Sequence, residues 1–412
     1  MTSRPAGADN RIITRDFSGT WAQLGESSSL TLPPASAVAV RDNLDAARAV
    51  WAAASGEHEL LVASQTRLTE DLTQDLREAG LAIVREGGEQ VAPPLTERAA
   101  EPGRVWLLTS GSTGRPKRVA HTLESLTTVG QGQPPRVWLC PYAHGAYAWW
   151  QVVTLGVNLP GQDILFVEPD ELDTWPARAV EAGVSAATGT PTFWRQALYR
   201  DPESVAALPL QQVTLGGEPV DQAILTRLSE MFPDARVSWI YASSEAGATI
   251  AVHDGLAGFP QEWLGVEKPG RATLSIDGDE LLIASPKRGE GIPEVLRTGD
   301  RVEVVDGRVL ITGRLASDEI NVGGAKASAS TVRGVLQAHP AVAWASVKGR
   351  KAPIVGAMVT AEIVPTDPGT DVKALEPELM AWCRDRLPDY SVPRRLRFLD
   401  QIPIKETLKS DV

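Results

Sequence analysis

Residues 109–118 read Thr-Ser-Gly-Ser-Thr-Gly-Arg-Pro-Lys-Arg and directly follow the apolar run Val105–Leu108. The glycines allow a tight backbone, so that main-chain N–H groups and hydroxyls can converge on one anion with cations beside it. The spacing does not fit the Walker pattern. An ordinary Ser/Gly turn is the alternative. We expect a loop that binds a polyphosphate, made by Thr109, Ser110, Gly111, Ser112, Thr113, Gly114 and Lys117.

Four further motifs follow this loop in order. They are Tyr241–Glu245, Thr298–Asp300, Gly313-Arg314 with the Asp318–Gly324 stretch after it, and Ile402–Lys409. With the loop, they make the chain similar to the adenylate-forming superfamily of acyl-CoA synthetases, peptide-synthetase adenylation domains and luciferases. Within it, the chain resembles a short acyl- or aryl-CoA ligase. The resemblance runs from about residue 105 to the end.

The resemblance implies an α/β fold: a large N-terminal domain of layered sheets and helices with a small β-barrel subdomain, and a small mobile α+β C-terminal domain. The apolar runs Leu60–Ala63 and Leu81–Val84, with a helical stretch over 66–79 between them, agree with layered parallel sheets. From Ala272 the strands alternate around Asp-Gly turns, which is a hairpin pattern.

We place the N-terminal domain at 1–314, its barrel-like part at 272–312, and the C-terminal domain at 315–412. The resemblance implies that the small domain rotates between two half-reactions about a hinge. In this chain the hinge residue would be Ala316 or Ser317.

Composition excludes several other classes. The formal net charge of -12 argues against a general nucleic-acid binder. Two cysteines and five histidines offer neither a disulfide framework nor a zinc cluster, which suits a reducing, cytoplasmic setting. No stretch reaches transmembrane length, so we expect no membrane partner.

The resemblance assigns roles around ATP and Mg²⁺. Glu245 would bind Mg²⁺, a hard cation that prefers one or two carboxylates plus phosphate oxygens, and Ser244 would contact the α-phosphate. Tyr241 would lie against adenine, Asp300 would accept from the ribose hydroxyls, and Arg314 would donate to them. The turn lining the adenine pocket would be Gly217, Glu218 and Pro219. Taken singly, each of these residues has an ordinary structural explanation.

Lys409 matches the C-terminal lysine that family members place between the carboxylate and the α-phosphate. A cation there stabilises the transition state more than the ground state, and so raises the rate. Lys405 is a rival four residues away, and a solvated tail lysine is the structural alternative.

The acyl pocket is less clearly marked. His144, in Pro141-Tyr142-Ala143-His144, resembles the family's Pro-x-x-His stretch, and we count it among the catalytic residues. We expect no acid near it to pair with an ammonium group, so a free α-amino acid is not expected. Five aromatic residues could line a pocket for an aryl or short apolar acid, or could equally be core: Tyr147, Trp149, Trp150, Phe193 and Trp194.

The acceptor is coenzyme A or the phosphopantetheine of an acyl carrier protein, because Gly323 and Gly324 resemble the glycine loop that lines the pantetheine tunnel. The basic run 348–351 could contact CoA phosphates or an acidic carrier, but a solvated turn is the better interpretation. Two other functions remain open: a nucleotide-binding protein without turnover, and a ligase that passes the adenylate to an amine or another non-thiol nucleophile.

Overall fold

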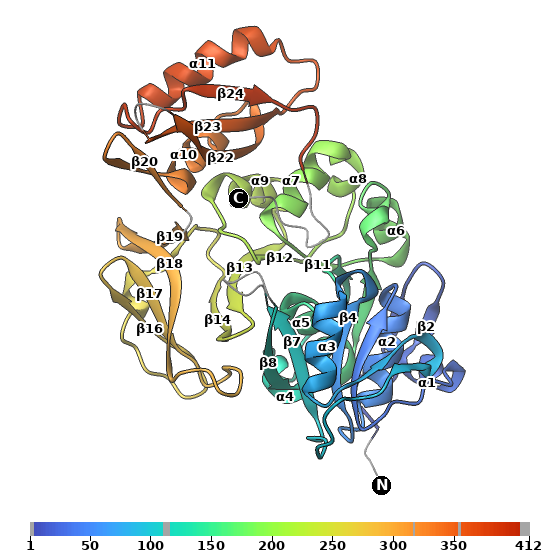
Figure 1. The fold of residues 1–412 in the computed structure, drawn as a ribbon. Coiled ribbons are helices and arrows are strands. Elements are labelled where there is room, and N and C mark those ends of the chain that lie inside the picture. Colours follow the sequence, from blue (N-terminus) through green and yellow to red (C-terminus); the bar gives the residue numbers. More distant parts are fainter. Residues whose placement is uncertain (1–3, 110–115, 316–317, 353–355, 404–412) are drawn as a thin grey trace.

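Four β-sheets and the helices packed on them make up the structure, a computed structural model that describes residues 4–109, 116–315, 318–352 and 356–403. Figure 1 shows the N-terminal sheets together on one side, a yellow antiparallel sheet on the other, and the orange-red C-terminal part above them. The fold is mixed α/β, with a large N-terminal domain and a smaller C-terminal domain, as the sequence predicts.

The first sheet has six strands in the order β6-β5-β3-β4-β7-β8. Its inner strands are parallel and mostly apolar, which is typical of strands covered on both faces. The helix expected over 66–79 begins later, at Glu70, because the Thr69 side chain caps it by accepting from the Leu72 N–H. The strands are β3 Ala35–Val40, β4 Glu59–Ser64, β5 Ala82–Val84, β6 Gln90–Ala92, β7 Arg104–Thr109 and β8 Lys117–Thr122, and the helices are α1 Trp21–Ser27, α2 Asn43–Ala53 and α3 Glu70–Glu78.

The second sheet has eight strands in the order β14-β13-β12-β11-β9-β10-β1-β2. All its inner pairs are parallel, and only the edge strands β14 and β2 run against their neighbours. The strands are β1 Arg11–Ile13, β2 Ser18–Thr20, β9 Arg136–Cys140, β10 Gln162–Phe166, β11 Ala186–Gly189, β12 Gln212–Gly216, β13 Arg236–Ser243 and β14 Gly247–Val252. Its helices are α4 Leu123–Leu126, α5 Tyr147–Asn158, α6 Trp175–Ala182, α7 Pro191–Arg200, α8 Pro202–Ala206 and α9 Gln222–Met231.

The third sheet is an antiparallel meander that confirms the expected hairpins around the two Asp-Gly turns. It differs from the expectation in extent, since Phe259 already pairs with it and its last strand ends at Arg314. Among the described residues its outer strands β15 and β16 each have one partner strand, and a bridge between Leu264 and Leu274 links the segment after β15 to β16, which fits the expected barrel-like subdomain. The strands are β15 Phe259–Pro260, β16 Thr273–Asp277, β17 Glu280–Ala284, β18 Val295–Val305 and β19 Arg308–Arg314.

The C-terminal domain is a five-stranded sheet with two helices. The basic run 348–351 is exposed but lies inside β22, paired with β23, so the expected turn is wrong. The strands are β20 Glu319–Val322, β21 Ala325–Ser328, β22 Val342–Ala352, β23 Gly356–Pro365 and β24 Arg395–Phe398, and the helices are α10 Ala329–Gln337 and α11 Val372–Arg384. Short 3₁₀ turns elsewhere cover Gln65–Arg67, Glu86–Gly88, Pro169–Glu171 and Gln261–Trp263.

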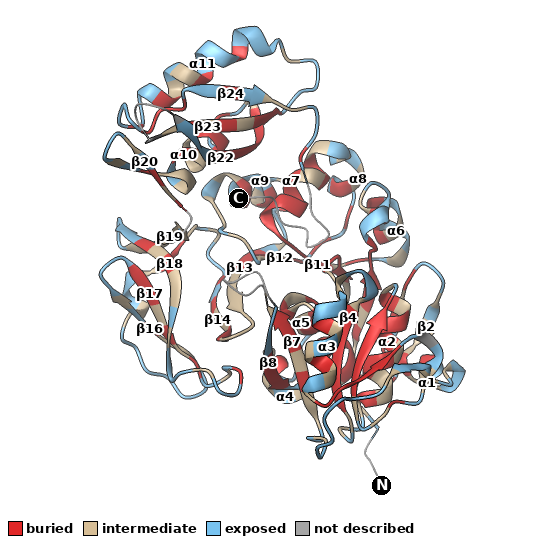
Figure 2. Ribbon diagram, in the orientation of Figure 1, coloured by how far each residue is buried: buried red, intermediate tan, exposed pale blue. Residues whose placement is uncertain are grey.

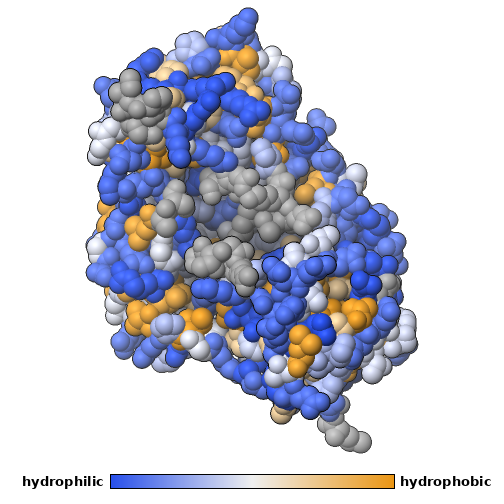
Figure 3. Space-filling model, in the orientation of Figure 1, coloured by the Kyte–Doolittle hydropathy of each residue, from blue (hydrophilic) through white to orange (hydrophobic). Residues whose placement is uncertain are grey.

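Burial follows these layers. Figure 2 shows buried residues concentrated in the strands and on the helix faces turned towards them, with exposed residues on the outer faces. On the face drawn in Figure 3, hydrophilic side chains predominate and hydrophobic ones form small separate groups. Within the described part of the chain, no helix combines the length and apolar character needed to cross a bilayer.

Candidate active site

Several of the expected site residues lie at one edge of the eight-stranded sheet. β9 pairs with β10 on one side and with β11 on the other, so the order of the strands reverses between β9 and β11. Ligands of open α/β sheets bind in the crevice outside the carboxyl ends of the strands at such a switch point. His144 follows β9, Glu218 follows β12, and Tyr241 and Ser244 lie at the end of β13.

Tyr241, Asp300 and Arg314 form one cluster. The Tyr241 hydroxyl donates to Asp300 Oδ2, and Arg314 Nε lies 2.9 Å from Asp300 Oδ1. Asp300 and Arg314 face each other across β18 and β19, so the third sheet supplies two of these residues and the second sheet supplies one. Three residues expected around the nucleoside, from motifs far apart in sequence, are therefore in contact.

Burial explains the electrostatics of this cluster. Burial raises the pKa of Asp300 above its ordinary value, and the Arg314 guanidinium and the Tyr241 hydroxyl oppose that shift. The pKa of Tyr241 is also raised, by burial and by the charge of Asp300. Each carboxylate oxygen can accept a second hydrogen bond, so Asp300 can still accept from a ligand's hydroxyls while holding its two protein partners.

Ser244 and Glu245 lie in the turn between β13 and β14. The Glu245 main-chain oxygen accepts from the Gly289 N–H at 2.9 Å. Its half-buried carboxylate makes no hydrogen bond or ion pair with any described residue, and so has free oxygens for a cation. Among the described residues no three His, Cys, Asp or Glu side chains converge.

His121 was missed by the sequence analysis, although it touches this turn. It lies in β8, 2% exposed, and its Nε2 donates to the Ser244 carbonyl oxygen at 2.7 Å. Burial holds its pKa below the ordinary value. The only sequence signal was a histidine inside a short apolar run directly after the predicted phosphate loop, which does not distinguish a site residue from core.

The expected phosphate loop connects two paired strands. Thr109 ends β7, Lys117 begins β8, and these two residues are partners in the antiparallel ladder. Ser110, Gly111, Ser112, Thr113 and Gly114 lie outside the described residues. Lys405, Lys409, Ala316 and Ser317 lie outside them as well.

The turn after β12 is bound to the next helix. Gly217 has a φ of 83°, a conformation that favours glycine. Glu218 Oε2 accepts from the Thr192 N–H at 3.0 Å, in the first turn of α7. Pro219 is exposed. β12 pairs in parallel with β13, the strand that contains Tyr241, so this turn lies at the same carboxyl edge as the end of β13.

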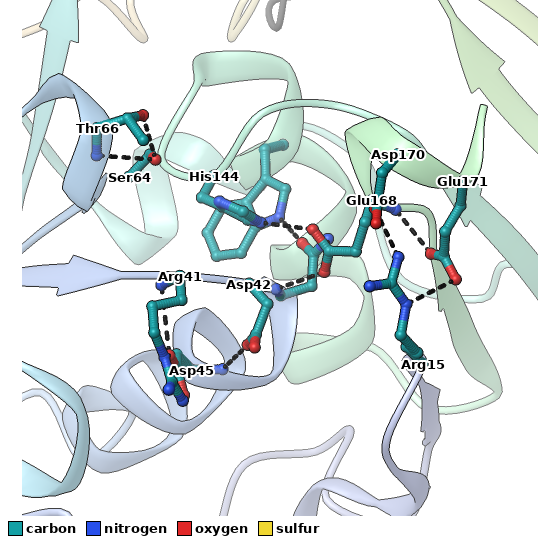
Figure 4. A network of polar contacts seen from close by, with 12 residues as sticks. Arg15, Arg41, Asp42, Asp45, Ser64, Thr66, His144, Glu168, Asp170 and Glu171 are labelled. Atoms are coloured by element: carbon teal, nitrogen blue, oxygen red, sulfur yellow. Dashed lines mark hydrogen bonds and ion pairs between the residues drawn. The ribbon is translucent and has the colours of Figure 1, made fainter.

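His144 does have an acid beside it, in space rather than in sequence. Its Nε2 lies 3.4 Å from Glu168 Oε2, and Figure 4 shows the two side chains turned towards each other. Glu168 Oε1 also accepts from the Asn43 N–H and amide, at 2.7 and 2.9 Å. Burial alone would raise the pKa of Glu168, but the bonds from His144 and Asn43 outweigh it and lower that pKa. The expectation that no acid lies near His144 is therefore wrong.

The five aromatic residues belong to the hydrophobic core. All are at most 8% exposed, and they pack edge-on or tilted against other buried rings. Trp149 donates to Asn43 Oδ1 at 2.9 Å, behind the His144–Glu168 pair. Of the two interpretations, the structure supports core rather than an open aromatic pocket.

Gly323 and Gly324 form the turn of the β20–β21 hairpin, with φ values of 61° and 91°. The Gly324 N–H donates to Asn321 Oδ1 at 3.0 Å. At the base of this hairpin, Glu319 lies 3.5 Å from Arg301, the neighbour of Asp300. The Arg301–Glu319 ion pair therefore connects the base of this hairpin to β18.

Two family profiles match the chain, that of the AMP-binding enzyme over residues 34–316 and that of the AMP-binding enzyme C-terminal domain over residues 333–409. The chain belongs to the AMP-binding enzyme family. The resemblance to adenylate-forming enzymes is thereby confirmed.

Similar proteins are named for different carboxylic acids. A feruloyl-CoA synthase of an Amycolatopsis species is 27% identical over 72% of this chain and 66% of its own length. A 2-succinylbenzoate–CoA ligase of Salmonella typhimurium is 28% identical over 70% of this chain and 63% of its own. A D-alanine–D-alanyl carrier protein ligase of Staphylococcus epidermidis is 25% identical, over 74% and 69%. The match thus spans just under two thirds of the first two relatives.

Solved structures share the fold over nearly the whole chain. An anthranilate CoA ligase in complex with anthranoyl-AMP has a TM-score of 0.73 at 17% identity, covering 98% of this chain and 93% of that one. A benzoate CoA ligase of Burkholderia xenovorans has a TM-score of 0.72 at 20% identity, covering 99% and 96%. An amide bond synthetase of Marinactinospora thermotolerans has a TM-score of 0.66 at 21% identity, covering 98% and 96%.

Proposed function

We propose that this AMP-binding enzyme activates a small carboxylic acid with ATP and transfers the acyl group to a thiol. The carboxylate attacks the α-phosphorus, an acyl adenylate forms, and pyrophosphate leaves. The thiol of CoA, or of a carrier protein's phosphopantetheine, then attacks the acyl carbon and releases AMP. This makes the chain an AMP-forming acid–thiol ligase.

The contact among Tyr241, Asp300 and Arg314, at the switch-point edge of the sheet, carries this proposal. A ribose offers two adjacent hydroxyls, and a buried carboxylate flanked by a cation is suited to accept from both. Tyr241, already held through its hydroxyl by Asp300, is in place to lie against the adenine ring. Thr109 and Lys117, where the loop 110–115 begins and ends, would bind the phosphates together with that loop.

Mg²⁺ would be held by Glu245, whose free, half-buried carboxylate fits a hard cation that keeps several water and phosphate ligands. When bound, the ion neutralises charge on the phosphates. The task of this chain's residues is alignment, since two anions must be brought together and the growing charge offset. Ser244 would donate to the α-phosphate, and Lys409 would offset charge between it and the carboxylate.

For the acid, we propose a small aryl or short apolar carboxylate. Relatives are named for ferulate and succinylbenzoate, and structures of similar fold for anthranilate and benzoate. A free α-amino acid is disfavoured because both oxygens of Glu168 are already engaged, Oε1 by Asn43 and Oε2 by His144. His144 would close the acyl side of the site.

The thiol is proposed to reach the adenylate past Gly323 and Gly324, where an added Cβ would meet no atom within 4 Å, so the turn is open on that side. Transfer to an amine is the second candidate, favoured by the likeness of the fold to an amide bond synthetase. Two free, buried cysteines suit a reducing compartment, and we propose a cytoplasmic setting.

Pyrophosphate release with ATP and Mg²⁺, over a panel of aryl and short-chain acids, tests the proposal. We expect acid-dependent release, and loss on the order of 10²–10³ in rate for Lys409→Ala. If pyrophosphate release survives that substitution, the catalytic role belongs to Lys405 instead of Lys409. ATP binding without release for any acid would instead indicate a nucleotide-binding protein without turnover. Product masses with CoA, and with an amine in its place, separate the two acceptors.

A further inference from the structure

His121 occupies a position that the proposed chemistry does not yet use. It stands in β8, the strand that leaves the predicted phosphate loop, four residues after Lys117. It is 2% exposed, so it is not available to a ligand as the chain stands. Its two ring nitrogens are nevertheless both engaged, Nε2 with the Ser244 oxygen at 2.7 Å and Nδ1 with Ser125 Oγ at 3.0 Å.

The partners assign the hydrogens of the ring. A carbonyl oxygen can only accept, so Nε2 carries the hydrogen that points at Ser244. Nδ1 then lies beside Ser125 Oγ, whose single hydroxyl hydrogen can point at Nδ1 or at the Thr122 oxygen 3.1 Å away. Fixing the Ser244 carbonyl also fixes the Glu245 N–H, because both lie in one rigid peptide plane.

The next peptide plane is held from the opposite side. The Glu245 carbonyl accepts from the Gly289 N–H at 2.9 Å, and the Glu290 N–H donates to the Ala120 oxygen at 3.0 Å. The 289–290 loop therefore ties the turn back to the residue before His121. Both peptide planes flanking Glu245 are thereby fixed, and with them the direction in which its side chain leaves the backbone.

We propose that His121 is a positioning residue: its Nε2–H orients the Ser244–Glu245 turn and couples it to the strand that leaves the phosphate loop. The inference rests on the proposed function, in which Glu245 serves the cation and Ser244 the α-phosphate. A group that orients a metal ligand from behind typically contributes 10–100-fold to affinity or activity.

Two substitutions separate the donor from the rest of the ring. The side-chain amide of His121→Gln reaches the position of Nε2 and can donate to Ser244. That of His121→Asn reaches only the position of Nδ1. His339→Gln is the matched control, since His339 is also buried, at 6% exposure, but lies in the C-terminal domain.

The experiment measures pyrophosphate release, kcat and KM for ATP at several Mg²⁺ concentrations, and the melting temperature of each variant. We expect His121→Gln and His339→Gln to stay near the wild type. We expect His121→Asn to lose about 10–100-fold in kcat/KM for ATP. Its melting temperature should equal that of His121→Gln. Equal activities of the Gln and Asn variants, or a loss that follows melting temperature alone, would overturn the positioning role.

The dissociation constant of ATP with Mg²⁺, measured on the same variants, keeps this result separate from the proposed function. If the wild type binds ATP but releases no pyrophosphate, the proposed function is wrong, and the Gln–Asn difference in affinity still decides the role of His121. If the wild type binds no ATP with Mg²⁺, both proposals are wrong.

Discussion

Asp300 holds two side chains that come from different sheets. Its carboxylate accepts from Tyr241 and pairs with Arg314, and it is 6% exposed. Hydrogen bonds to a charged group contribute more than neutral ones, about 1.5–3 kcal/mol each. A single residue therefore fixes the relative placement of the two groups expected to bind adenine and ribose.

Asp300→Asn should weaken ATP binding about 10–100-fold, because the amide loses the charge that pairs with Arg314 and accepts at only one of its two atoms. The dissociation constant of ATP, measured by calorimetry, checks this. Asp306→Asn is the matched control, since Asp306 lies exposed in a turn of the same sheet at a φ of 50°, which Asn tolerates. Unchanged affinity in Asp300→Asn would remove Asp300 from the ribose site.

Glu245→Gln should raise the Mg²⁺ concentration needed for half-maximal pyrophosphate release about tenfold or more, because an amide is a poorer ligand for a hard cation. The measurement is release against total Mg²⁺ at fixed ATP. The exposed Glu262→Gln serves as control. A Mg²⁺ dependence that does not change would mean that the cation is bound elsewhere.

At this scale the motifs predicted Tyr241, Asp300 and Arg314, and the structure brings them into contact. The motifs could not predict that His121 supports the turn or that Glu168 partners His144. Both of these residues are buried, and each contacts a residue more than twenty positions away in the sequence. Nothing in the adjacent sequence therefore marks them. The assigned ligand roles stay predictions.

Strand β4 shows how one element fixes its neighbours. Glu59, fully buried at its start, accepts from Arg98 Nη1 at 2.8 Å, from the Glu101 N–H at 2.9 Å and from Trp106 Nε1. It thereby holds the segment before β7 and the start of that strand, which leads into the predicted phosphate loop. Burial alone would raise the pKa of Glu59, but these donors outweigh it and lower that pKa.

Glu59→Gln should destabilise the protein by about 1–3 kcal/mol, since the donors that share its buried carboxylate would lose one acceptor oxygen, while the exposed Arg98 stays solvated. The pH dependence has a defined sign. Because its folded-state pKa is lowered, Glu59 adds stability above its unfolded-state pKa of about 4.3, and this is lost as pH falls through the folded-state value.

Denaturant unfolding between pH 3 and 7 measures this effect. The wild type should lose stability on the acid side more steeply than Glu59→Gln. The exposed Glu57→Gln should follow the wild type. If the free energy of unfolding of the wild type and of Glu59→Gln fell equally steeply at acid pH, the carboxylate would not be held by these donors.

The elements themselves were largely predictable. Apolar runs and Asp-Gly turns predicted strands that the structure confirms, such as β4, β5 and the β18–β19 hairpin. The helix start at Glu70 depended on a cap, and the extra strand Phe259–Pro260 on pairing with a strand some fifty residues away. Periodicity within one segment contains neither kind of information.

One contact between the two domains is a small apolar cluster, separate from the Arg301–Glu319 ion pair. Trp344, Val364 and Ile402 of the C-terminal domain cluster with Tyr199 of α7, and the Tyr199 hydroxyl donates to the Asp400 oxygen at 3.1 Å. Arg200 of the same helix donates to Gln401 at 2.9 Å. This cluster joins α7 to the C-terminal domain, which Figure 1 draws above that helix.

Trp344→Ala should uncouple the two domains, because it removes a side chain 2% exposed from the centre of this contact, at a cost of about 3–5 kcal/mol. Scanning calorimetry should give one transition for the wild type and two for this variant. Trp382→Ala, which alters a tryptophan within α11, is the control and should lower stability without splitting the transition. A single transition in Trp344→Ala would mean that other contacts couple the domains.

Sheet order and the relation of the domains lie beyond what the sequence alone predicts. The reversal of strand order between β9 and β11, which creates the crevice, depends on pairings between segments about fifty residues apart. The placement of the small domain depends on side chains such as Tyr199 and Ile402, about two hundred residues apart. Only the whole chain specifies them, whereas the division at 314–315 and the rotation stay predictions.

The most direct test of the account follows oxygen atoms. If an acid labelled with ¹⁸O in its carboxylate attacks the α-phosphorus of ATP, the acyl adenylate carries a bridging label, and attack on the acyl carbon leaves one ¹⁸O in AMP. Mass spectrometry of AMP formed with a reactive acid, ATP, Mg²⁺ and CoA should find that label. AMP without ¹⁸O, or ADP as the nucleotide product, would contradict activation through an acyl adenylate.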